Sequence, residues 1–243
     1  ELISRMSKSL SKLGAEVIEL PSIDLVPCEQ NEPLQAALED IVSYQWVAFT
    51  SAMGVRFFFD FLQKNRVDVR KLSHLRFAVI GQGTRDELTK HGIFADLMPS
   101  SYYAKDLAQA LCQTMQKGQR VLLPRARIGS KDLTDILTQN GIEFTDVALY
   151  DTIYQSHNTH AVEKLIDDGQ VSCAVFTSAS TVRGFAATMQ GKDLSLLTAA
   201  CIGEKTAQAA KEYNMKVMIA KEATIDSVTQ MLVEHADELR LNR

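Results

Sequence analysis

The chain has 243 residues, of which 46% are hydrophobic and 23% are charged, and its formal net charge is −4. This composition is typical of globular protein and argues against a nucleic-acid partner, which would need clustered Lys and Arg. No apolar run approaches the roughly 20 residues of a transmembrane helix and the first residues lack the apolar core of a signal peptide, so we expect a cytoplasmic protein without membrane contact.

Short β-branched runs alternate with helical periodicity along the chain, which predicts parallel strands covered by helices on both faces. The expected strands are Glu16–Leu20, Trp46–Thr50, Phe77–Ile80, Ala95–Met98, Arg120–Pro124, Glu143–Leu149, Cys173–Thr177, Ala200–Ile202 and Val217–Ala220. The expected helices are Leu2–Leu13, Pro33–Val42, Ala52–Lys64, Thr84–His91, Ala104–Met115, Lys131–Asn140, His160–Asp168, Thr181–Met189, Thr206–Tyr213 and Ile225–Ala236.

Part of the sequence occurs twice. Phe49-Thr50-Ser51-Ala52 returns as Phe176-Thr177-Ser178-Ala179, a spacing of 127 from position 49 to position 176. Ile80-Gly81-x-x-Thr84 returns as Ile202-Gly203-x-x-Thr206, a spacing of 122 from position 80 to position 202. Two similar units predict two similar domains, with a small-molecule site in the cleft between them.

Two segments, Pro21–Cys28 and Leu149–Tyr154, are strand-like but each follows a completed strand, so we interpret them as connectors between the domains. The strand expected at Arg120–Pro124 has no counterpart in the first unit, because the spacing places it before residue 1. A doubly wound sheet of order 2-1-3-4-5 would then lack its central strand. We therefore predict several further residues, about one strand, ahead of Glu1.

Several residues follow strands and begin helices, at the sheet edge where α/β proteins bind ligands. Gly81-Gln82-Gly83-Thr84 and its repeat Gly203-Glu204-Lys205-Thr206 present N–H groups that suit an anion. The first motif by itself is more simply a tight turn with Thr84 as the helix cap, but its repetition argues against coincidence. Ser51 and Ser178 likewise either cap helices or contact carboxylates. Neither serine has a recognisable His and Asp partner, which argues against nucleophilic catalysis.

Arg125 and Arg127 follow a strand, where a guanidinium can hold a carboxylate through two hydrogen bonds or simply lie in a solvated loop. Tyr150, at the second connector, is either a proton donor that stays neutral at pH 7 or a packing residue. The four cysteines and five histidines lack metal-site spacing, so we expect no metal.

In their order and spacing, a set of motifs resembles uroporphyrinogen-III synthase over nearly the whole chain. They are Gly14–Ile23, Phe49–Ala52, Gly81-x-x-Thr84, Lys117–Arg125, Val147–Thr152, Phe176–Val182, Ile202–Ala207 and Ala220–Ile225. The resemblance implies an α/β protein with two similar doubly wound, parallel-sheet (flavodoxin-like) domains joined by a two-stranded connector. A discontinuous first domain would comprise residues 1–21 plus 156–243, the second domain residues 30–148, and the connector strands residues 22–29 and 149–155.

The same resemblance implies a lyase of porphyrin and heme biosynthesis that needs no cofactor. Its substrate would be hydroxymethylbilane, a linear tetrapyrrole, which is closed with loss of water and inversion of ring D. Tyr150 matches the family's proposed proton donor, and Thr84 and Thr206 match two threonines that would hydrogen-bond substrate. The candidates for binding its carboxylates are Ser51, Gly81, Arg125, Arg127, Ser178, Gly203 and Lys205. We expect a monomer, and a transient hand-over of the bilane from the enzyme that forms it is a further hypothesis.

Two other functions stay open from the residues alone. A two-domain module that closes on a small anion without chemistry has the same composition, and only an assay with hydroxymethylbilane separates the two. A dinucleotide-dependent dehydrogenase is disfavoured, because Asp86 stands where the third glycine of G-x-G-x-x-G would lie and would repel a pyrophosphate.

Overall fold

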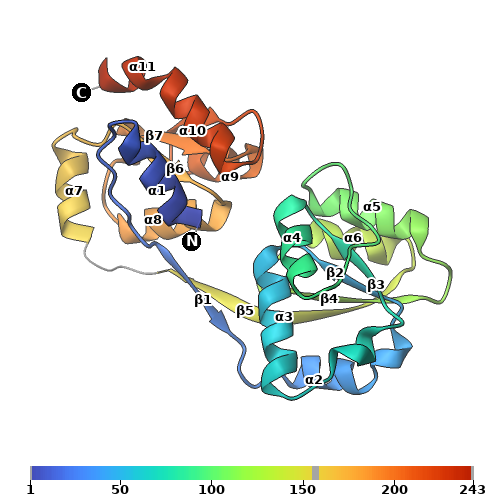
Figure 1. The fold of residues 1–243 in the computed structure, drawn as a ribbon. Coiled ribbons are helices and arrows are strands. Elements are labelled where there is room, and N and C mark those ends of the chain that lie inside the picture. The colour runs from blue at the N-terminus through green and yellow to red at the C-terminus, as the bar shows by residue number, and fades with distance from the viewer. Residues whose placement is uncertain (1, 155–158, 242–243) are drawn as a thin grey trace. The chain divides into compact units, whose positions relative to one another are not determined.

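The structure, a computed structural model, describes residues 2–154 and 159–241. The chain divides into two compact units, unit 1 formed by Glu1–Asp24 with Ile153–Arg243 and unit 2 formed by Leu25–Thr152. Each unit has its own parallel-type sheet and its own helices (Figure 1). None of the helices in the described ranges is long and apolar enough to span a bilayer.

Unit 2 contains a five-stranded sheet of order β1-β5-β4-β2-β3. Its strands are β1 (Ile23–Pro27), β2 (Trp46–Phe49), β3 (Arg76–Val79), β4 (Arg120–Ala126) and β5 (Glu143–Tyr154). Its helices are α2 (Glu32–Glu39), α3 (Ala52–Lys64), α4 (Gln82–Lys90), α5 (Ala104–Thr114) and α6 (Lys131–Gln139), with 3-10 turns η1 (Ile41–Ser43) and η2 (Val69–Leu72). The β2–β3, β2–β4 and β4–β5 pairs are parallel.

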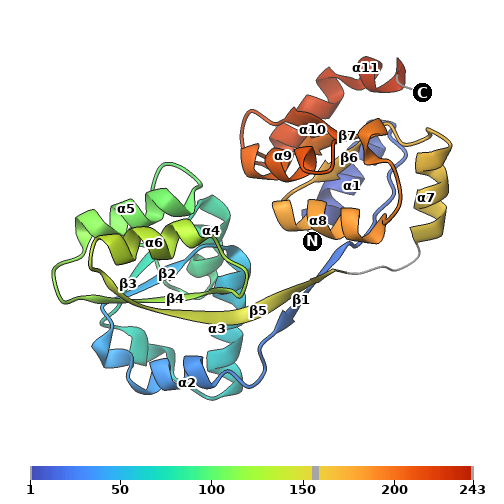
Figure 2. The ribbon, with the colours of Figure 1, turned by 180° about the vertical axis from the view of Figure 1, so that it is seen from behind.

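Helices cover both faces of this sheet. Successive residues of a strand point to opposite sides, and in β2 the side chains on both sides are apolar and packed against helices. Val47 and Phe49 of β2 enter one core with α2, α3 and α4, whereas Trp46 and Ala48 enter another core with α5 and α6. Figure 2 shows α5 and α6 side by side over one face, with α2 and α3 on the other. A strand buried on both faces explains the continuous apolar run in the sequence.

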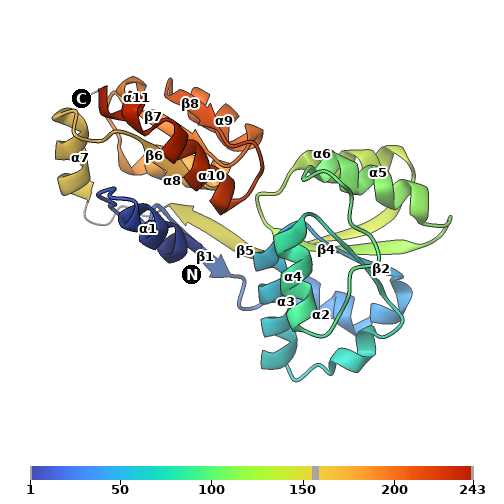
Figure 3. The ribbon, with the colours of Figure 1, turned by 45° about the horizontal axis from the view of Figure 1, so that its top comes forward.

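Unit 1 contains a three-stranded parallel sheet of order β6-β7-β8, labelled in Figure 3. Its strands are β6 (Ala174–Phe176), β7 (Thr198–Cys201) and β8 (Lys216–Ile219). Its helices are α1 (Leu2–Lys12), α7 (Thr159–Asp167), α8 (Ala179–Thr188), α9 (Glu204–Lys211), α10 (Ile225–Glu234) and α11 (Ala236–Leu241), with a 3-10 turn η3 (Leu194–Leu196). Ala199 and Cys201 face a core with α8 and α9, and Ala200 faces a core with α1 and α10.

Three strand predictions were wrong in detail. Glu16–Leu20 forms no strand and is mostly exposed, because no strand of the described residues lies beside it to take its backbone hydrogen bonds. Ala95–Met98 contributes only a single bridge, from Leu97 to Ala78. The strand expected to end at Leu149 continues to Tyr154. It pairs with β4 past a bulge as far as Tyr150, and β1 is its neighbour on the other side. The prediction of residues ahead of Glu1 stays a prediction.

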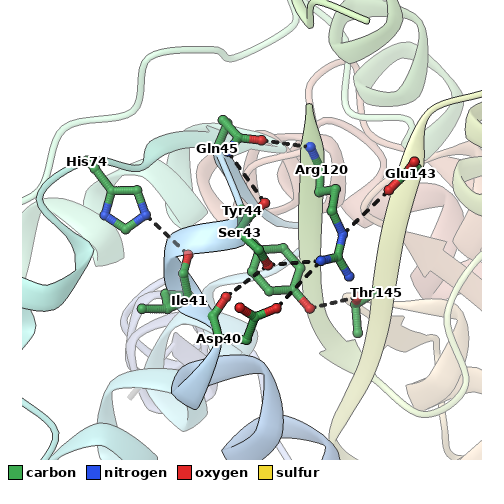
Figure 4. A network of polar contacts seen from close by, with 9 residues as sticks. All are labelled: Asp40, Ile41, Ser43, Tyr44, Gln45, His74, Arg120, Glu143 and Thr145. Carbon is green, nitrogen blue, oxygen red and sulfur yellow. Dashed lines mark hydrogen bonds and ion pairs between the residues drawn. The ribbon is translucent and has the colours of Figure 1, made fainter. Parts of the chain in front are cut away.

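The amino ends of the strands in unit 2 are joined by a polar network centred on Arg120 (Figure 4). The Arg120 guanidinium donates to Ser43 Oγ at 2.9 Å and stacks over the Tyr44 ring, 4.7 Å from its centroid. Asp40 and Glu143 lie 3.7 Å from it on either side. This network ties η1 and its flanking residues to the first residues of β4 and β5.

Candidate functional site

The predicted site residues of unit 2 gather at the carboxyl edge of the sheet. Ser51 and Gly81 stand two residues after the ends of β2 and β3, and Arg127 directly follows β4. Tyr150 of β5 pairs with Ala126, the last residue of β4. Because these four strands run parallel in the sheet, their carboxyl ends share the edge at which open α/β sheets bind ligands.

Tyr150 is 6% exposed and its hydroxyl lies 3.2 Å from Ser51 Oγ. Its ring packs against Phe57 of α3, with 4.9 Å between the centroids and 34° between the planes. Burial raises the pKa of the Tyr150 phenol above its ordinary value. Since the ordinary pKa of a phenol is already about 10, the group carries a proton at neutral pH that it can donate.

Ser51 is the N-cap of α3, with extended backbone and a side chain that accepts from Gly54 N at 3.0 Å. The same geometry recurs in unit 1, where Ser178 caps α8 in a full capping box with Thr181. Both serines thus do the capping that the sequence pattern indicates. Ser51 differs in that it also contacts Tyr150.

Gly81 begins α4 at φ 75°, a backbone conformation that favours glycine. A Cβ at this position would meet the Tyr102 ring at 2.7 Å, so the aromatic ring lies directly on the Gly81 backbone. The N-terminus of α4 has no side-chain cap. Tyr102 itself is 55% exposed, which leaves an aromatic surface beside the uncapped N–H groups.

Thr84 and Thr206 are only 5% and 4% exposed. Within the described residues, neither hydroxyl makes a hydrogen bond, yet no fully buried side-chain polar atom there lacks a partner. Both hydroxyls consequently keep a small contact with solvent. A hydroxyl that contacts solvent but bonds to no described residue is available to a ligand.

Arg125 is 6% exposed and fully engaged inside unit 2. Its guanidinium makes a bidentate pair with Asp146, at 2.8 and 2.6 Å, and donates to Ser130 O at 2.7 Å. Arg127 is more open: its Nε donates to Asp151 Oδ1 at 2.7 Å and its backbone N–H donates to Tyr150 O at 3.0 Å. Of the two arginines, only Arg127 has an exposed guanidinium.

Unit 1 places its predicted residues at the corresponding helix starts. Gly203 is the N-cap of α9 with fully extended backbone at φ −175°, and no atom lies within 4 Å of the space a Cβ would take. Lys205 is exposed in the first turn of α9, as is Glu204. The Glu204 carboxylate offsets part of the positive potential that this helix end would offer an anion.

Two aromatic residues at this edge, Phe57 and Tyr102, are not among the residues predicted from the sequence. Phe57 is one of three consecutive phenylalanines in α3, and periodicity alone does not show which of them meets a residue of β5. Tyr102 lies in a loop after Pro99, where an exposed aromatic pair, Tyr102 and Tyr103, is an available signal. Among the described residues, no group of three His, Cys, Asp or Glu side chains is placed to hold a metal ion.

Comparison with known proteins finds one family whose model, described as Uroporphyrinogen-III synthase HemD, matches residues 4–230. A porphyrin biosynthesis protein HemD of Ruminiclostridium josui is 40% identical over 227 residues, which are 93% of this chain but 45% of that protein. A uroporphyrinogen-III synthase of Chlorobaculum parvum is 26% identical over 88% of this chain and 87% of its own.

Among solved structures, a mutant uroporphyrinogen III synthase from the extremely thermophilic bacterium Thermus thermophilus is similar with a TM-score of 0.69. The match covers 98% of this chain and 94% of that one, at 15% identity. At this identity the likeness concerns the fold, which is α/β with parallel sheets in both units.

Proposed function

This chain belongs to the uroporphyrinogen-III synthase family, whose members are hydro-lyases of tetrapyrrole biosynthesis, and on that premise we propose that it closes hydroxymethylbilane to uroporphyrinogen III. Water is lost and ring D is inverted in this reaction. The observation that carries the proposal is the family match over residues 4–230. Since the chain spans less than half of the Ruminiclostridium josui relative, nothing else that protein does is carried over.

The chemistry asks little of the protein beyond one proton and one substrate conformation. Protonation of the terminal hydroxyl of the bilane releases water and leaves an electrophilic azafulvene. Ring D then attacks through its substituted carbon, giving a spiro intermediate that fragments and recloses with the ring inverted. Loss of a ring proton restores the pyrrole and balances the proton supplied at the start.

Tyr150 is our candidate for the proton donor. Its phenol is neutral at pH 7 even at the ordinary tyrosine pKa of about 10, and the contacts with Ser51 and Phe57 hold its ring and hydroxyl in one place. A fixed neutral acid at the carboxyl edge of the sheet matches the single proton transfer that the first step requires.

We further propose that Thr84 and Thr206 hydrogen-bond the substrate or an intermediate, because both hydroxyls are nearly buried and lack partners among the described residues. The acetate and propionate groups of the bilane would bind at helix N-termini, where N–H groups and the helix dipole favour anions. The residues proposed for this are Ser51, Gly81, Arg127, Ser178, Gly203 and Lys205, with the two serines contributing through the N-termini of the helices that they cap. Arg125 is the least suited of the predicted binding residues, since its donors already hold Asp146 and Ser130 O.

For the domain organisation, we propose that β1 and β5 are the two connector strands. They are neighbours in one sheet, and the boundary between the two units falls within both of them, at 24/25 and 152/153. Residue 155 and the predicted domain start at 156 lie outside the described residues. The monomeric state, the cytoplasmic location and the hand-over of the bilane stay predictions.

The deciding experiment supplies the purified protein with hydroxymethylbilane and separates the uroporphyrinogen isomers. We expect type III to predominate, because the unaided bilane closes without inversion and gives type I. A module that only binds a small anion would leave type I as the sole product, and that result would overturn the proposal.

A further inference from the structure

The contact between Ser51 and Tyr150 has no counterpart in unit 1, although Ser51 itself is repeated as Ser178. At the spacing of 127 residues, Tyr150 corresponds to Ile23, and Phe57 corresponds to Gly184. Gly184 lies so close to Ser22 and Ile23 that a Cβ would collide with the Ser22 backbone oxygen. Unit 2 has the ring contact between Phe57 and Tyr150. At the corresponding place in unit 1, Gly184 of α8 packs directly against Ser22 and Ile23.

In unit 1 the hydroxyl of Ser178 is occupied by its own helix. Its Oγ accepts from Thr181 N at 3.2 Å and lies 2.9 Å from Ser180 Oγ and 3.4 Å from Thr181 Oγ1. The Thr181 side chain completes the box by accepting from Ser178 N at 3.2 Å. Both the proton and the lone pairs of Ser178 therefore have partners within three residues.

In unit 2 the position of Thr181 is taken by Gly54, which has no side chain to complete a box. A Cβ at Gly54 would lie 3.3 Å from Pro124 O and 3.4 Å from Ser51 Oγ, so a larger residue would crowd the space around the serine. Ser51 Oγ accepts from Gly54 N and keeps its own proton. Tyr150 Oη, at 3.2 Å, is the partner that the structure shows for it.

A serine hydroxyl has one proton to donate and two lone pairs. Accepting the Gly54 N–H polarises the Ser51 O–H bond and makes it a better donor. If Ser51 donates to Tyr150 Oη, the phenol proton must point elsewhere and is free for the substrate. If Tyr150 donates to Ser51, the proton needed for catalysis is already used.

We propose that Ser51 donates its proton to Tyr150 Oη and so acts as a positioning residue that keeps the phenol proton of Tyr150 available to the bilane. This inference rests on the proposed function only for its catalytic consequence. The direction of the hydrogen bond can be measured without substrate.

The first test titrates Tyr150 by ultraviolet difference absorbance, with Tyr150→Phe as the blank. A hydrogen bond donated to the phenol oxygen stabilises the phenolate and lowers the pKa, whereas one accepted from the phenol stabilises the neutral form. If Ser51 is the donor, Ser51→Ala moves the Tyr150 midpoint to higher pH. A shift to lower pH overturns the inference, whatever the activity of the protein proves to be.

The second test compares turnover in Ser51→Asp and Ser51→Thr. A carboxylate caps α3 as well as serine does, but it has no proton and would draw the phenol proton to itself. We expect Ser51→Asp to lower kcat roughly 10- to 100-fold, within the contribution of a general acid, and to raise KM as well, because the new carboxylate repels the carboxylates of the bilane. Ser51→Thr keeps the hydroxyl and should retain kcat within about threefold of the wild type.

The matched control is Thr224→Asp at the N-cap of α10, where Thr224 Oγ1 accepts from Ser227 N at 3.1 Å. It makes the same cap exchange with no phenol beside it, and should leave kcat unchanged. Wild-type kcat in Ser51→Asp, or equal losses in Ser51→Asp and Ser51→Thr, contradicts the positioning role. A wild-type protein that yields only type I contradicts the proposed function instead, and the titration still decides the hydrogen bond.

Discussion

The guanidinium of Arg125 holds the carboxylate of Asp146 through two parallel hydrogen bonds, from Nε to Oδ1 at 2.8 Å and from Nη2 to Oδ2 at 2.6 Å. The pair joins neighbouring strands β4 and β5, and its arginine side chain is only 8% exposed. Arg125 therefore stabilises the sheet, and its engaged donors are not available to a ligand. The sequence pattern alone, an arginine after a strand, leaves both roles open.

We therefore predict that Asp146→Asn lowers the free energy of unfolding by about 1–3 kcal/mol, because a nearly buried guanidinium loses its charged partner. The measurement is urea unfolding at pH 7. Asp86→Asn is the control, since its pair with Arg85, at 3.4 Å, is exposed on both sides and should cost less than about 1 kcal/mol. Equal effects of the two changes would show that the Arg125 pair is not structural.

Thr84→Val and Thr206→Val should separate binding from stability. Valine has the shape of threonine, and neither threonine hydroxyl bonds to a described residue. The free energy of unfolding should therefore stay the same or rise slightly. If the hydroxyls bind substrate, each change lowers kcat/KM roughly 2- to 10-fold, the worth of one hydrogen bond. Thr181→Val is the control: its hydroxyl donates to Ser178 O at 2.7 Å, so stability should fall by about 1 kcal/mol.

Gly81→Ala should destabilise unit 2 by about 1–3 kcal/mol, because the backbone at φ 75° is unfavourable for alanine. The new methyl group would also press on the Tyr102 ring. Gly83→Ala, nearby in α4, meets no atom within 4 Å and should be neutral or stabilising by up to about 1 kcal/mol. Thermal unfolding of the two variants gives the comparison, and a stabilised Gly81→Ala would contradict the local geometry.

Glu87 predicts a specific acid sensitivity. Hydrogen bonding to Arg56 and then to Lys90 lowers the pKa of the Glu87 carboxyl from 4.5 to about 2, against the opposing effect of burial. Because the folded pKa lies below the unfolded one, this stabilisation is complete above about pH 4.5 and is lost as the pH falls toward 2. Solvent screens Arg56 and Lys90, whose side chains are 44% and 61% exposed, so Glu87→Gln should lose about 1–2 kcal/mol at pH 7 and much less near pH 2.

Urea unfolding at several pH values measures that difference. The control is Asp68→Asn, because Arg70 lowers the pKa of Asp68 to about 2 as well, but in an exposed pair that solvent screens. Asp68→Asn should lower the free energy of unfolding by less than Glu87→Gln does, and the difference from wild type should decrease as salt is added. A Glu87→Gln cost that does not change with pH would rule out linkage at this carboxylate.

Tyr150→Phe should lower kcat by about 10²-fold or more, within the range of a general acid, and more than any single change at Thr84 or Ser178. Several residues are proposed to bind the substrate, so the loss of Thr84 or Ser178 leaves the others in place. Tyr150 is the one proposed source of the proton. The measurement is initial formation of the type III isomer. Equal losses in Tyr150→Phe and Thr84→Val would remove the proton-donor role.

Elements with local signals could be predicted from the sequence. The helix Ala52–Lys64 is predicted with both of its ends, because the Ser51 cap and the apolar period both lie within or beside the segment. The repeat of Phe-Thr-Ser-Ala and Gly-x-x-Thr predicts two similar units, and the order of motifs predicts the family that the comparison finds. These features can be recognised in the sequence without knowing any contact between distant residues.

Features that depend on partners far along the chain could be seen only in the folded protein. Glu16–Leu20 has the composition of a strand but no described strand beside it, and a strand exists only through its neighbour's hydrogen bonds. Arg125 is occupied by Asp146, 21 residues away, and Ser51 meets Tyr150 across 99 residues. Residue type specifies what a side chain can bind, whereas the fold determines which partner it finds, because packing brings together groups that no local pattern links.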